Sequence, residues 1–405
     1  MNIRNVGHSM KYEAECVAML FFPDEKIVTA QYEAGAVLPQ DEDFIENRLE
    51  DGVMKVTLFL NGELSSMSQP VLPVANSPYE EAEFIMCDMM YQLLSRATGV
   101  QPAWGMITGV RPVKLFHKRL DAGKSPEETA REFAEHFHVS QEKIELALET
   151  AKHEAPILKE ATDDTYSLYI SIPFCPSRCS YCSFVSHDIA SKRAKEILPV
   201  YVDKLCEEIE SIGKTMAKIP ITLTTVYFGG GTPTSLSPED LDRLITKLKG
   251  TFDFSAVQEF TVEAGRPDSI TREKLEVLKK HGVGRISINP QTMKQDTLRL
   301  IGRRHTVEDV VDRFKLAREV GFDNINMDLI IGLPEETLED VQATMEAVKA
   351  LAPDSVTVHS LAIKRAARLN TMKEVYKDLK IENTQEMIDL TARYSREMGL
   401  EPYYL

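Results

Sequence analysis

Three of the six cysteines stand within eight residues of one another, as Cys175, Cys179 and Cys182. Their spacing, C-x3-C-x2-C, offers thiolates to a soft metal or to an iron–sulfur cluster. A structural zinc site commonly adds a second C-x2-C pair, which the sequence lacks, and His187 is the nearest other candidate ligand. Three cysteines cannot all pair as disulfides, and no feature suggests export. The spacing therefore predicts a [4Fe–4S] cluster with three protein ligands and one iron open to a substrate or cofactor. Three buried thiols in a turn are the simpler alternative.

The chain from Thr165 onward alternates apolar strands with helices. Six such units in a row predict a parallel sheet that is buried on both faces. Right-handed crossovers would curl this sheet into an open, partial (β/α)6 barrel of the TIM type. We expect its strands at Ser167–Ile172, Thr225–Phe228, Glu259–Glu263, Arg285–Asn289, Asn324–Leu329 and Ser355–His359, and its helices around Leu198–Met216, Pro238–Leu248, Arg272–His281, Val307–Val320, Leu338–Leu351 and Thr384–Met398.

Unusual residues follow each predicted strand, at the edge where barrels of this type carry their sites. Glycine without a Cβ lets backbone approach a ligand, and the N–H groups of a glycine turn can bind a carboxylate. Acidic side chains can accept bonds from an ammonium or a hydroxyl group, and an arginine can pair a carboxylate through two bonds. The alternatives are a tight turn, helix caps and a solvated charge. The residues concerned are Gly229–Gly231, Glu263, Gln291, Arg303, Asp328 and His359.

Length and composition favour a protein of two or three domains with a sizeable core, since 43% of the 405 residues are hydrophobic. The net charge of −16 argues against nucleic acid or an anionic membrane surface as a partner. Without an apolar run of membrane-spanning length or an apolar signal segment, a cytoplasmic location is expected. Cys16, Cys87 and Cys206 stand among apolar neighbours, which is typical of buried free thiols.

Residues 1–100 predict a small α+β module. We expect a strand at Glu15–Phe22, a second strand at Met54–Leu60 that ends in an Asn61-Gly62 turn, and a helix at Tyr79–Arg96. Nothing in this module requires catalysis, so a structural or docking role is favoured.

Residues 101–164 predict a helical connector between the module and the core at residues 165–405. A breaker-rich loop at Trp104–Pro112 is followed by a capping box at Ser125–Glu128 and by helices to about Leu158. His136 and His138 are two residues apart and would point to different helix faces, so we expect surface histidines rather than a metal pair.

The cysteine spacing, with an aromatic residue before Cys182, resembles the radical S-adenosylmethionine (SAM) superfamily. In that family SAM chelates the open iron, and an electron from the cluster cleaves SAM to methionine and a 5′-deoxyadenosyl radical. A set of further motifs resembles oxygen-independent coproporphyrinogen III oxidases. The amino-terminal extension, with Thr108-Gly-Val-Arg-Pro112 and His359-Ser-Leu-Ala-Ile-Lys-Arg365, is similar to the HemZ branch of that family. The core motifs are Tyr169–Cys175, Phe228–Thr234, Arg285–Gln291, Gly302–Thr306 and Asp328–Pro334.

The resemblance implies which residues hold SAM. The family binds two SAM molecules, and we expect this chain to bind one or two. Tyr169, Gly230 and Glu263 match contacts to the SAM on the cluster. The positions that match the second SAM site are Tyr181, Gly231, Thr232, Gln291, Arg303, Asp328 and Ala362. Two positions depart from the family pattern. Phe184 replaces a further cysteine, and Asn289-Pro290 replaces Gly-Val. The resemblance assigns no catalytic side chain.

The implied activity is that of an oxidoreductase of haem biosynthesis, which converts coproporphyrinogen III to protoporphyrinogen IX by oxidative decarboxylation. Its partners would be the tetrapyrrole substrate and a reductant such as flavodoxin or ferredoxin. Lys364, Arg365 and Arg368 could receive the substrate's carboxylates, or could form a solvated basic turn. The alternative function is a haem-binding chaperone of the same family without decarboxylase activity. Family members continue into a carboxyl-terminal domain, which we expect to be missing after Leu405; the oligomeric state is not predicted.

Overall fold

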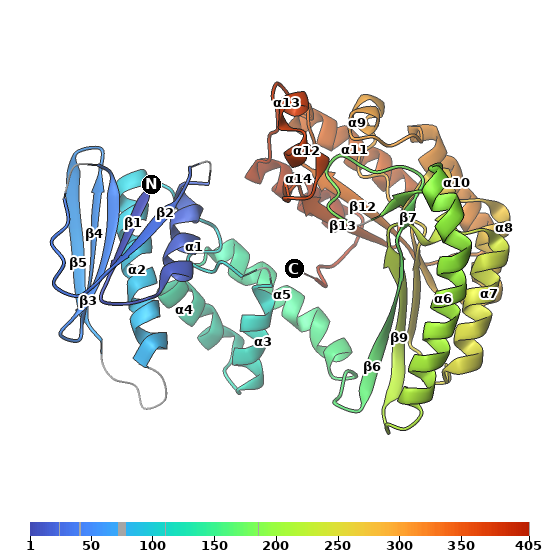
Figure 1. Cartoon of the computed structure of the whole chain (residues 1–405), viewed down its shortest axis with the longest axis horizontal. Helices are drawn as coiled ribbons and strands as arrows, with labels where there is room; N and C mark the ends of the chain where they lie inside the picture. The colour runs from blue at the N-terminus through green and yellow to red at the C-terminus, as the bar shows by residue number, and fades with distance from the viewer. Residues whose placement is uncertain (24, 40–41, 72–77, 110, 185, 405) are drawn as a thin grey trace. The chain divides into compact units, whose positions relative to one another are not determined.

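The structure is a computed structural model that describes the chain except residues 24, 40–41, 72–77, 110, 185 and 405, and the side chains of 78–80. The chain divides into two compact units (Figure 1). One comprises Met1–Ile157 with Pro402–Leu405, and the other comprises Leu158–Glu401. The predicted three-part division, with ends at residues 100 and 164, stays a prediction.

The first unit is built on a five-stranded sheet with the order β2-β1-β3-β4-β5. Strand β1 lies between β2 and β3 and is parallel to both, whereas β3, β4 and β5 form an antiparallel meander. Helices α1 and α2 share one hydrophobic core with the sheet. The elements are β1 (Asn2–Val6), α1 (Lys11–Phe21), β2 (Val28–Tyr32), β3 (Phe44–Glu50), β4 (Val53–Leu60), β5 (Glu63–Pro70) and α2 (Pro78–Thr98).

The strand predicted at Glu15–Phe22 is wrong, because these residues lie in or directly after helix α1. The buried residues Ala14, Val17, Ala18 and Phe21 recur every three or four positions, as they do on one face of a helix. The predicted strand at Met54–Leu60 lies within β4, and Asn61 follows with a φ of 52°.

Three helices complete this unit: α3 (Val113–Asp121), α4 (Pro126–Phe137) and α5 (Gln141–Leu158). The predicted capping box is present, since Ser125 and Glu128 each bond the other's backbone N–H. His136 is exposed as expected. His138 is instead half-buried, with Nε2 2.6 Å from Asp88 Oδ1. Val110, in the predicted breaker-rich loop, lies outside the described residues.

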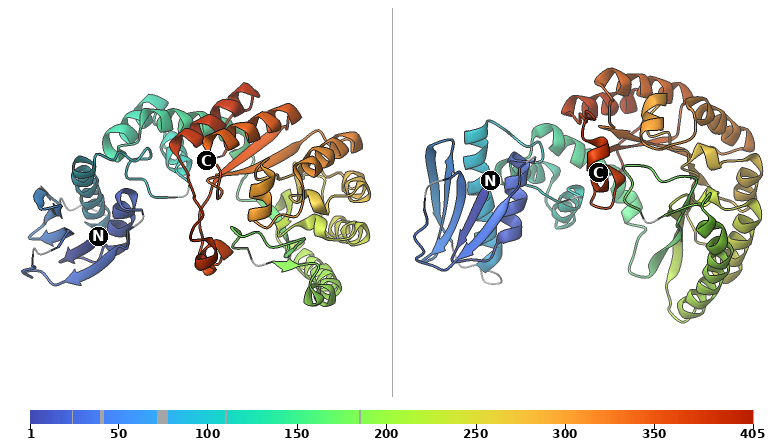
Figure 2. Two further views of the ribbon diagram at one scale, coloured as in Figure 1. Left: turned by 90° about the horizontal axis from the view of Figure 1, so that it is seen from above. Right: turned by 45° about the horizontal axis from the view of Figure 1, so that its top comes forward.

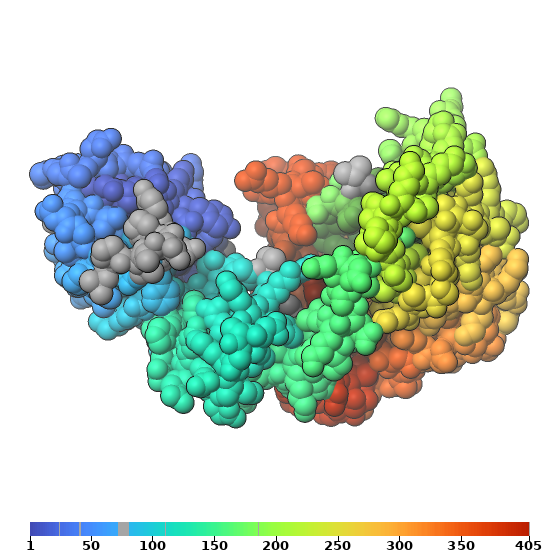
Figure 3. All heavy atoms as spheres, turned by 90° about the horizontal axis from the view of Figure 1, so that it is seen from below, coloured from blue at the N-terminus to red at the C-terminus, as the bar shows by residue number. Residues whose placement is uncertain are grey.

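The second unit contains six parallel strands that follow one another across the sheet in chain order. Each crossover contains a helix, and these helices lie along the outer side of the curved sheet (Figure 2). Figure 3 shows the continuous outer surface formed by α6, α7 and α8. The predicted partial (β/α)6 barrel is confirmed. Its elements are β6 (Thr165–Ile172), α6 (Lys192–Met216), β9 (Thr222–Gly230), α7 (Pro238–Thr251), β10 (Glu259–Glu263), α8 (Arg272–Lys280), β11 (Arg285–Ser287), α10 (Val307–Val320), β12 (Ile325–Ile331), α11 (Leu338–Leu351), β13 (Ser355–Ser360) and α14 (Gln385–Glu397).

Strand β11 ends at Ser287, two residues earlier than predicted. Pro290 has no N–H to give to a sheet ladder. Gln291 follows with a φ of 68°, a left-handed conformation that is uncommon for a residue with a side chain. The chain therefore turns at this point and brings Gln291 back into a single bridge with Leu329 of β12.

Within the described part of the chain, no helix combines the length and the apolar character needed to cross a membrane.

Candidate active site at the carboxyl edge of the barrel

The cysteine loop follows β6 and is tied down at several points. Cys175 belongs to β7 (Phe174–Cys175), which pairs in parallel with β8 (His187–Asp188). Further along, Ser177 Oγ donates to Gly302 O at 2.8 Å, and Ser180 N donates to Ile301 O at 2.9 Å. The loop is thus fastened to the segment that leads from α9 (Gln295–Leu300) to α10, which is distant in sequence.

The three loop thiols are free, and each has a hydrogen-bond donor beside it. Thr232 Oγ1 lies 3.5 Å from Cys175 Sγ, and Arg266 Nη1 lies 3.6 Å from Cys179 Sγ. Burial raises the pKa of Cys182, and the neighbouring thiolates of Cys179 and Cys175 add to the rise, whereas a backbone N–H of Phe184 and the Arg178 charge oppose it. Such donors stabilise thiolates, which are the form that binds iron.

The glycine turn at the end of β9 lies against the cysteine loop. Gly231 N donates to Ile172 O at 2.9 Å. Thr232 N donates to Phe174 O at 2.8 Å. A Cβ on Gly230 would lie 2.7 Å from a serine Oγ, and one on Gly231 would lie 2.7 Å from Phe174 O. The N–H group of Gly231, which we expected to be available for a carboxylate, therefore bonds the backbone before the cysteines instead, and the glycines are needed for close backbone packing.

The first half of the barrel edge carries a tyrosine pair and a buried carboxyl group. Tyr169 stacks on Tyr227, with ring centroids 5.8 Å apart, and is 54% exposed. Tyr227 donates from its hydroxyl to Glu263 Oε1 at 2.5 Å. Burial raises the pKa of Glu263 to about 7, with the Asp328 charge adding to the rise and the Tyr227 bond opposing it. Glu263 can therefore hold or release a proton near neutral pH.

The second half of the edge joins β11 and β12 through a polar network. Asp328 accepts from Asn289 Nδ2 at 2.8 Å and from Asn326 Nδ2 at 2.6 Å. Arg303 is 7% exposed and donates from Nη1 to Asn289 O at 2.5 Å. The backbone of Gln291 donates to Asp328 O at 3.0 Å. The residues at the ends of strands four and five are thus brought together, as their positions after parallel strands predicted.

Arg303 also links this network to the cysteine loop. Its Nη2 donates to the hydroxyl of Tyr181, which lies between two of the loop cysteines, at 3.3 Å. Its Nε is buried without a hydrogen-bond partner among the described residues. Native structures rarely leave a buried donor unpaired, so this nitrogen indicates that a ligand or a water binds at the network.

Ala362 lies after β13 and is exposed. Leu361 N donates to Ile331 O at 2.9 Å, which holds the start of this segment beside β12. His359 is exposed at the end of β13, and among the described residues no hydrogen bond joins it to the network around Asp328.

The comparisons with known proteins can now be set beside this geometry. Residues 169–348 match the family model of the radical SAM superfamily. This region is a radical SAM domain. Its boundaries run from the cluster strand β6 to α11, and the three loop cysteines and most of the edge residues described above lie within them.

The relatives confirm the narrower family that the motifs predicted. The chain is 40% identical over 316 residues to the oxygen-independent coproporphyrinogen-III oxidase-like protein HemZ of Bacillus subtilis (strain 168), covering 77% of this chain and 63% of the relative. It is 39% identical over 199 residues to the heme chaperone HemW of the same organism, covering 49% of this chain and 51% of the relative. The solved structure of the coproporphyrinogen III oxidase HemN from Escherichia coli matches with a TM-score of 0.50 and 28% identity, over 57% of this chain and 52% of that one.

The chain therefore spans between about half and two thirds of the length of these three relatives. Membership of the radical SAM superfamily implies a [4Fe–4S] cluster and SAM. The residues present fit that cluster, because three free thiols with separate donors stand on one loop of the radical SAM domain. Among the described residues, no three His, Cys, Asp or Glu side chains converge as ligands of a single metal ion. A cluster takes one thiolate per iron, so its ligands need not converge in that way.

Sequence reasoning missed three residues of the radical SAM domain. Arg266 reaches Cys179 and is 3% exposed; its only local signal was its place three residues after the end of β10. Tyr227 donates a hydrogen bond to Glu263. The alternation of side chains along β9 could have shown that Tyr227 shares a face of the sheet with Tyr169 of β6. Asn289 was noted only as a departure from the family pattern, yet it fixes Asp328.

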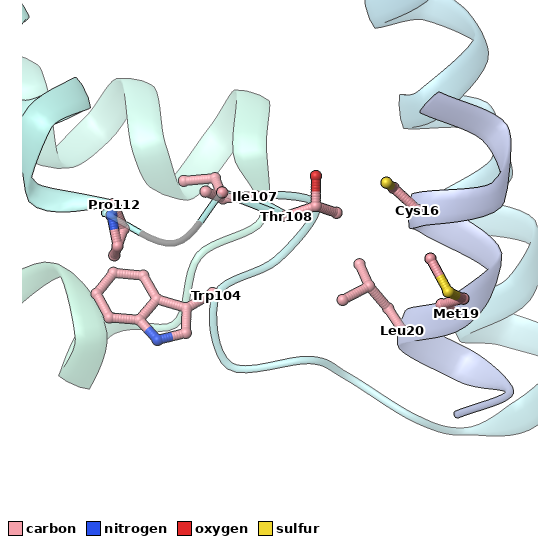
Figure 4. Close-up of a pocket in the computed structure, with 8 residues that line it drawn as sticks. Cys16, Met19, Leu20, Trp104, Ile107, Thr108 and Pro112 are labelled. Carbon is pink, nitrogen blue, oxygen red and sulfur yellow. The ribbon is translucent and has the colours of Figure 1, made fainter. Parts of the chain in front are cut away.

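The first unit contains a separate cavity of about 500 Å³ (Figure 4). Its lining is mostly apolar, with the Cys16 thiol, the Thr108 hydroxyl and the Trp104 indole N–H as its polar side-chain groups. In Figure 4 the side chains of α1 face those of the loop before α3 across the cavity. None of the described residues that line it carries a charged side chain. The lining residues are Cys16, Met19, Leu20, Trp104, Ile107, Thr108, Gly109 and Pro112.

Proposed function

We propose that this radical SAM protein carries out the oxygen-independent oxidative decarboxylation of coproporphyrinogen III to protoporphyrinogen IX. The names of the HemZ and HemN relatives support this substrate. When bound, the cluster and SAM supply a 5′-deoxyadenosyl radical that takes a hydrogen atom from a propionate side chain. A reductant such as flavodoxin or ferredoxin, and a cytoplasmic location, belong to the same proposal.

The observation that carries the proposal is a basic segment beside the cysteine loop. Lys364, Arg365 and Arg368 are exposed in the connection after β13. Leu369 N, one residue further on, donates to Ser180 O of the cysteine loop at 2.9 Å. A substrate with four carboxylates would therefore meet positive charge next to the cluster on a chain whose net charge is −16.

The edge residues receive proposed roles in holding SAM. We place Tyr169, Gly230 and Glu263 beside the SAM on the cluster. A second SAM would lie on the Asp328 network, where the unpaired Nε of Arg303 is a donor for a carboxylate. The other residues proposed for that second site are Tyr181, Gly231, Thr232, Gln291 and Ala362.

The direct test is anaerobic incubation of the reconstituted protein with reductant, SAM and coproporphyrinogen III. We expect vinyl-bearing products together with 5′-deoxyadenosine. SAM cleavage at a normal rate without vinyl products would rule out this substrate.

A charge-reversal series tests the role of the basic segment. Replacing Lys364 or Arg365 by glutamate should raise the KM for the porphyrinogen at least several-fold, because each change turns an attraction for a carboxylate into a repulsion. Lys218→Glu is the matched control, since Lys218 is an exposed lysine that follows α6 at its end remote from the cysteine loop. An equal KM in all variants would show that the segment does not receive the substrate.

A haem-binding chaperone is the second candidate, supported by the 39% identity to HemW and by Phe184 in place of a further cysteine. Haem titration followed by transfer to an apo-acceptor separates the two functions. Stoichiometric haem binding without porphyrinogen turnover would favour the chaperone.

A further inference from the structure

We propose that Arg266 is a positioning residue for the cluster and raises its reduction potential by placing a buried positive charge on the ligand Cys179. The inference rests on the cluster assignment and does not depend on which tetrapyrrole the protein uses.

The guanidinium group of Arg266 is fully engaged. Its Nη1 donates to Ser177 O at 3.1 Å and to Cys179 Sγ at 3.6 Å. Its Nη2 donates to Ser177 Oγ at 3.0 Å and to Asp268 Oδ2 at 2.9 Å, and its Nε donates to Asp268 Oδ1 at 3.0 Å. An arginine has five N–H donors, and here each has an acceptor. The charge is therefore held in one orientation, toward the cysteine loop.

The backbone around Arg266 supports this orientation. Its carbonyl accepts from Ser269 N at 2.9 Å and from Ser269 Oγ at 2.7 Å, within the short helix η2 (Pro267–Ser269). On the other side, a Cβ on Gly265 would lie 2.9 Å from Asn289 Nδ2, so this glycine allows close approach of β10 to the polar network. Behind Asp268 lies His305, which is 1% exposed, with Nδ1 3.9 Å from Asp268 Oδ1.

The three cluster ligands have different donors. Cys175 has the neutral hydroxyl of Thr232, Cys182 has a backbone N–H of Phe184, and Cys179 has the cationic guanidinium. Hydrogen bonds and positive charge at cluster sulfurs stabilise the reduced cluster, which carries one more negative charge. Cys179 is 8% exposed, so little water screens the interaction. Among the three donors, Arg266 should therefore have the largest effect on the potential.

The test is an EPR-monitored redox titration of the anaerobically reconstituted protein, without SAM or substrate. Arg266→Gln removes a charge-assisted hydrogen bond, so the ratio of reduced to oxidised cluster at the wild-type midpoint should fall by about tenfold, or about 59 mV for one electron. Thr232→Val, which removes the neutral donor, should shift the potential less. Iron and sulfide content equal to that of the wild type is checked first in each variant.

Asp268→Asn is the decisive second variant. It leaves the guanidinium beside Cys179 but removes the neutralising carboxylate, so the potential should rise. A purely structural role for Arg266 predicts no such opposite shift. An Arg266→Gln protein with full cluster content and an unchanged potential would overturn the proposal. If Arg266→Gln assembles no cluster, the Asp268→Asn protein decides the question. A rise in its reduction potential supports the proposal, and a fall or no change overturns it. A wild type that assembles no cluster would overturn the cluster assignment and this inference together, whereas failure to decarboxylate would contradict only the proposed substrate.

Discussion

At the scale of single residues, the three loop cysteines are the proposed cluster ligands, and the other three thiols have a packing role. Cys206 is 8% exposed and belongs to the hydrophobic core around α6, while Cys16 and Cys87 are buried in the first unit. Replacing Cys175, Cys179 or Cys182 by alanine should abolish the cluster, because each change exposes a second iron. Iron and sulfide content and the reduced-state EPR signal after reconstitution measure this.

Alanine at Cys206 serves as the control for this series. It removes only a small buried side chain, so cluster content should be unchanged and the loss of stability should be below the ~2 kcal/mol at which larger truncations begin. A full cluster signal in any loop variant, or its loss in Cys206→Ala, would mean that the ligands are wrongly assigned.

At the scale of elements, a buried carboxyl group joins the β11–α9 connection to the start of α11. Glu336 is 4% exposed and accepts a short hydrogen bond from the Thr292 hydroxyl, which lies near the hydroxyl of Thr344 on α11. Burial raises the pKa of Glu336 from 4.5 to about 7, partly opposed by its threonine hydrogen bonds. The folded protein therefore binds this proton more tightly than the unfolded chain does.

This difference predicts how stability changes with pH. Glu336 contributes stability below pH 4.5, and the contribution is lost as the pH rises to about 7. Relative to Glu336→Gln, the wild type should thus become less stable by roughly 1 kcal/mol per pH unit across that window and by no more than about 3 kcal/mol in total. Urea unfolding at several pH values measures the difference.

The exposed Glu276 on α8 provides the matched substitution. Glu276→Gln should follow the pH profile of the wild type, because its side chain reaches water in both states. If Glu336→Gln shows the same profile as Glu276→Gln, the carboxyl group of Glu336 is not the source of the pH dependence.

At the scale of the whole molecule, the two units have separate hydrophobic cores. The last three residues of α5 and residues 159–164, which connect α5 to β6, are all exposed. Exposed connections between compact units are preferred sites of proteolysis. Brief digestion with trypsin should therefore cut first after Lys159 and leave two resistant fragments, identified by mass spectrometry.

Lys159→Gln should abolish this early cleavage and leave the later pattern intact. Exposed Lys214, within the long helix α6, should resist cleavage on the same timescale because its backbone is held in helical hydrogen bonds. An early cut at Lys214 would show that the barrel helices open as readily as the connection does.

The main architecture of the second unit could be predicted from the sequence, because its signals are local. Helical and strand periodicities alternate six times, and helix caps such as Thr306 and Thr337 act within three residues of themselves. In a parallel sheet, chain order also places every strand end on one edge, which is why Glu263 and Asp328 were expected at the site. The strand predicted at Glu15–Phe22 was wrong because this apolar run fits either a strand or a helix. The packing of its residues against the sheet and α2 decides between the two.

The sequence by itself determined the three thiols, their spacing and the family of the chain, since these depend on residue type and on distance along the chain. Only the tertiary structure decided what surrounds them. Arg266 reaches Cys179 across 87 positions, and Arg303 reaches Tyr181 across 122. The N–H groups of the glycine turn bond the cysteine segment because β9 pairs with β6. Contacts of this kind depend on how the strands are ordered in space. A local sequence pattern does not specify which distant side chain will contact a given residue.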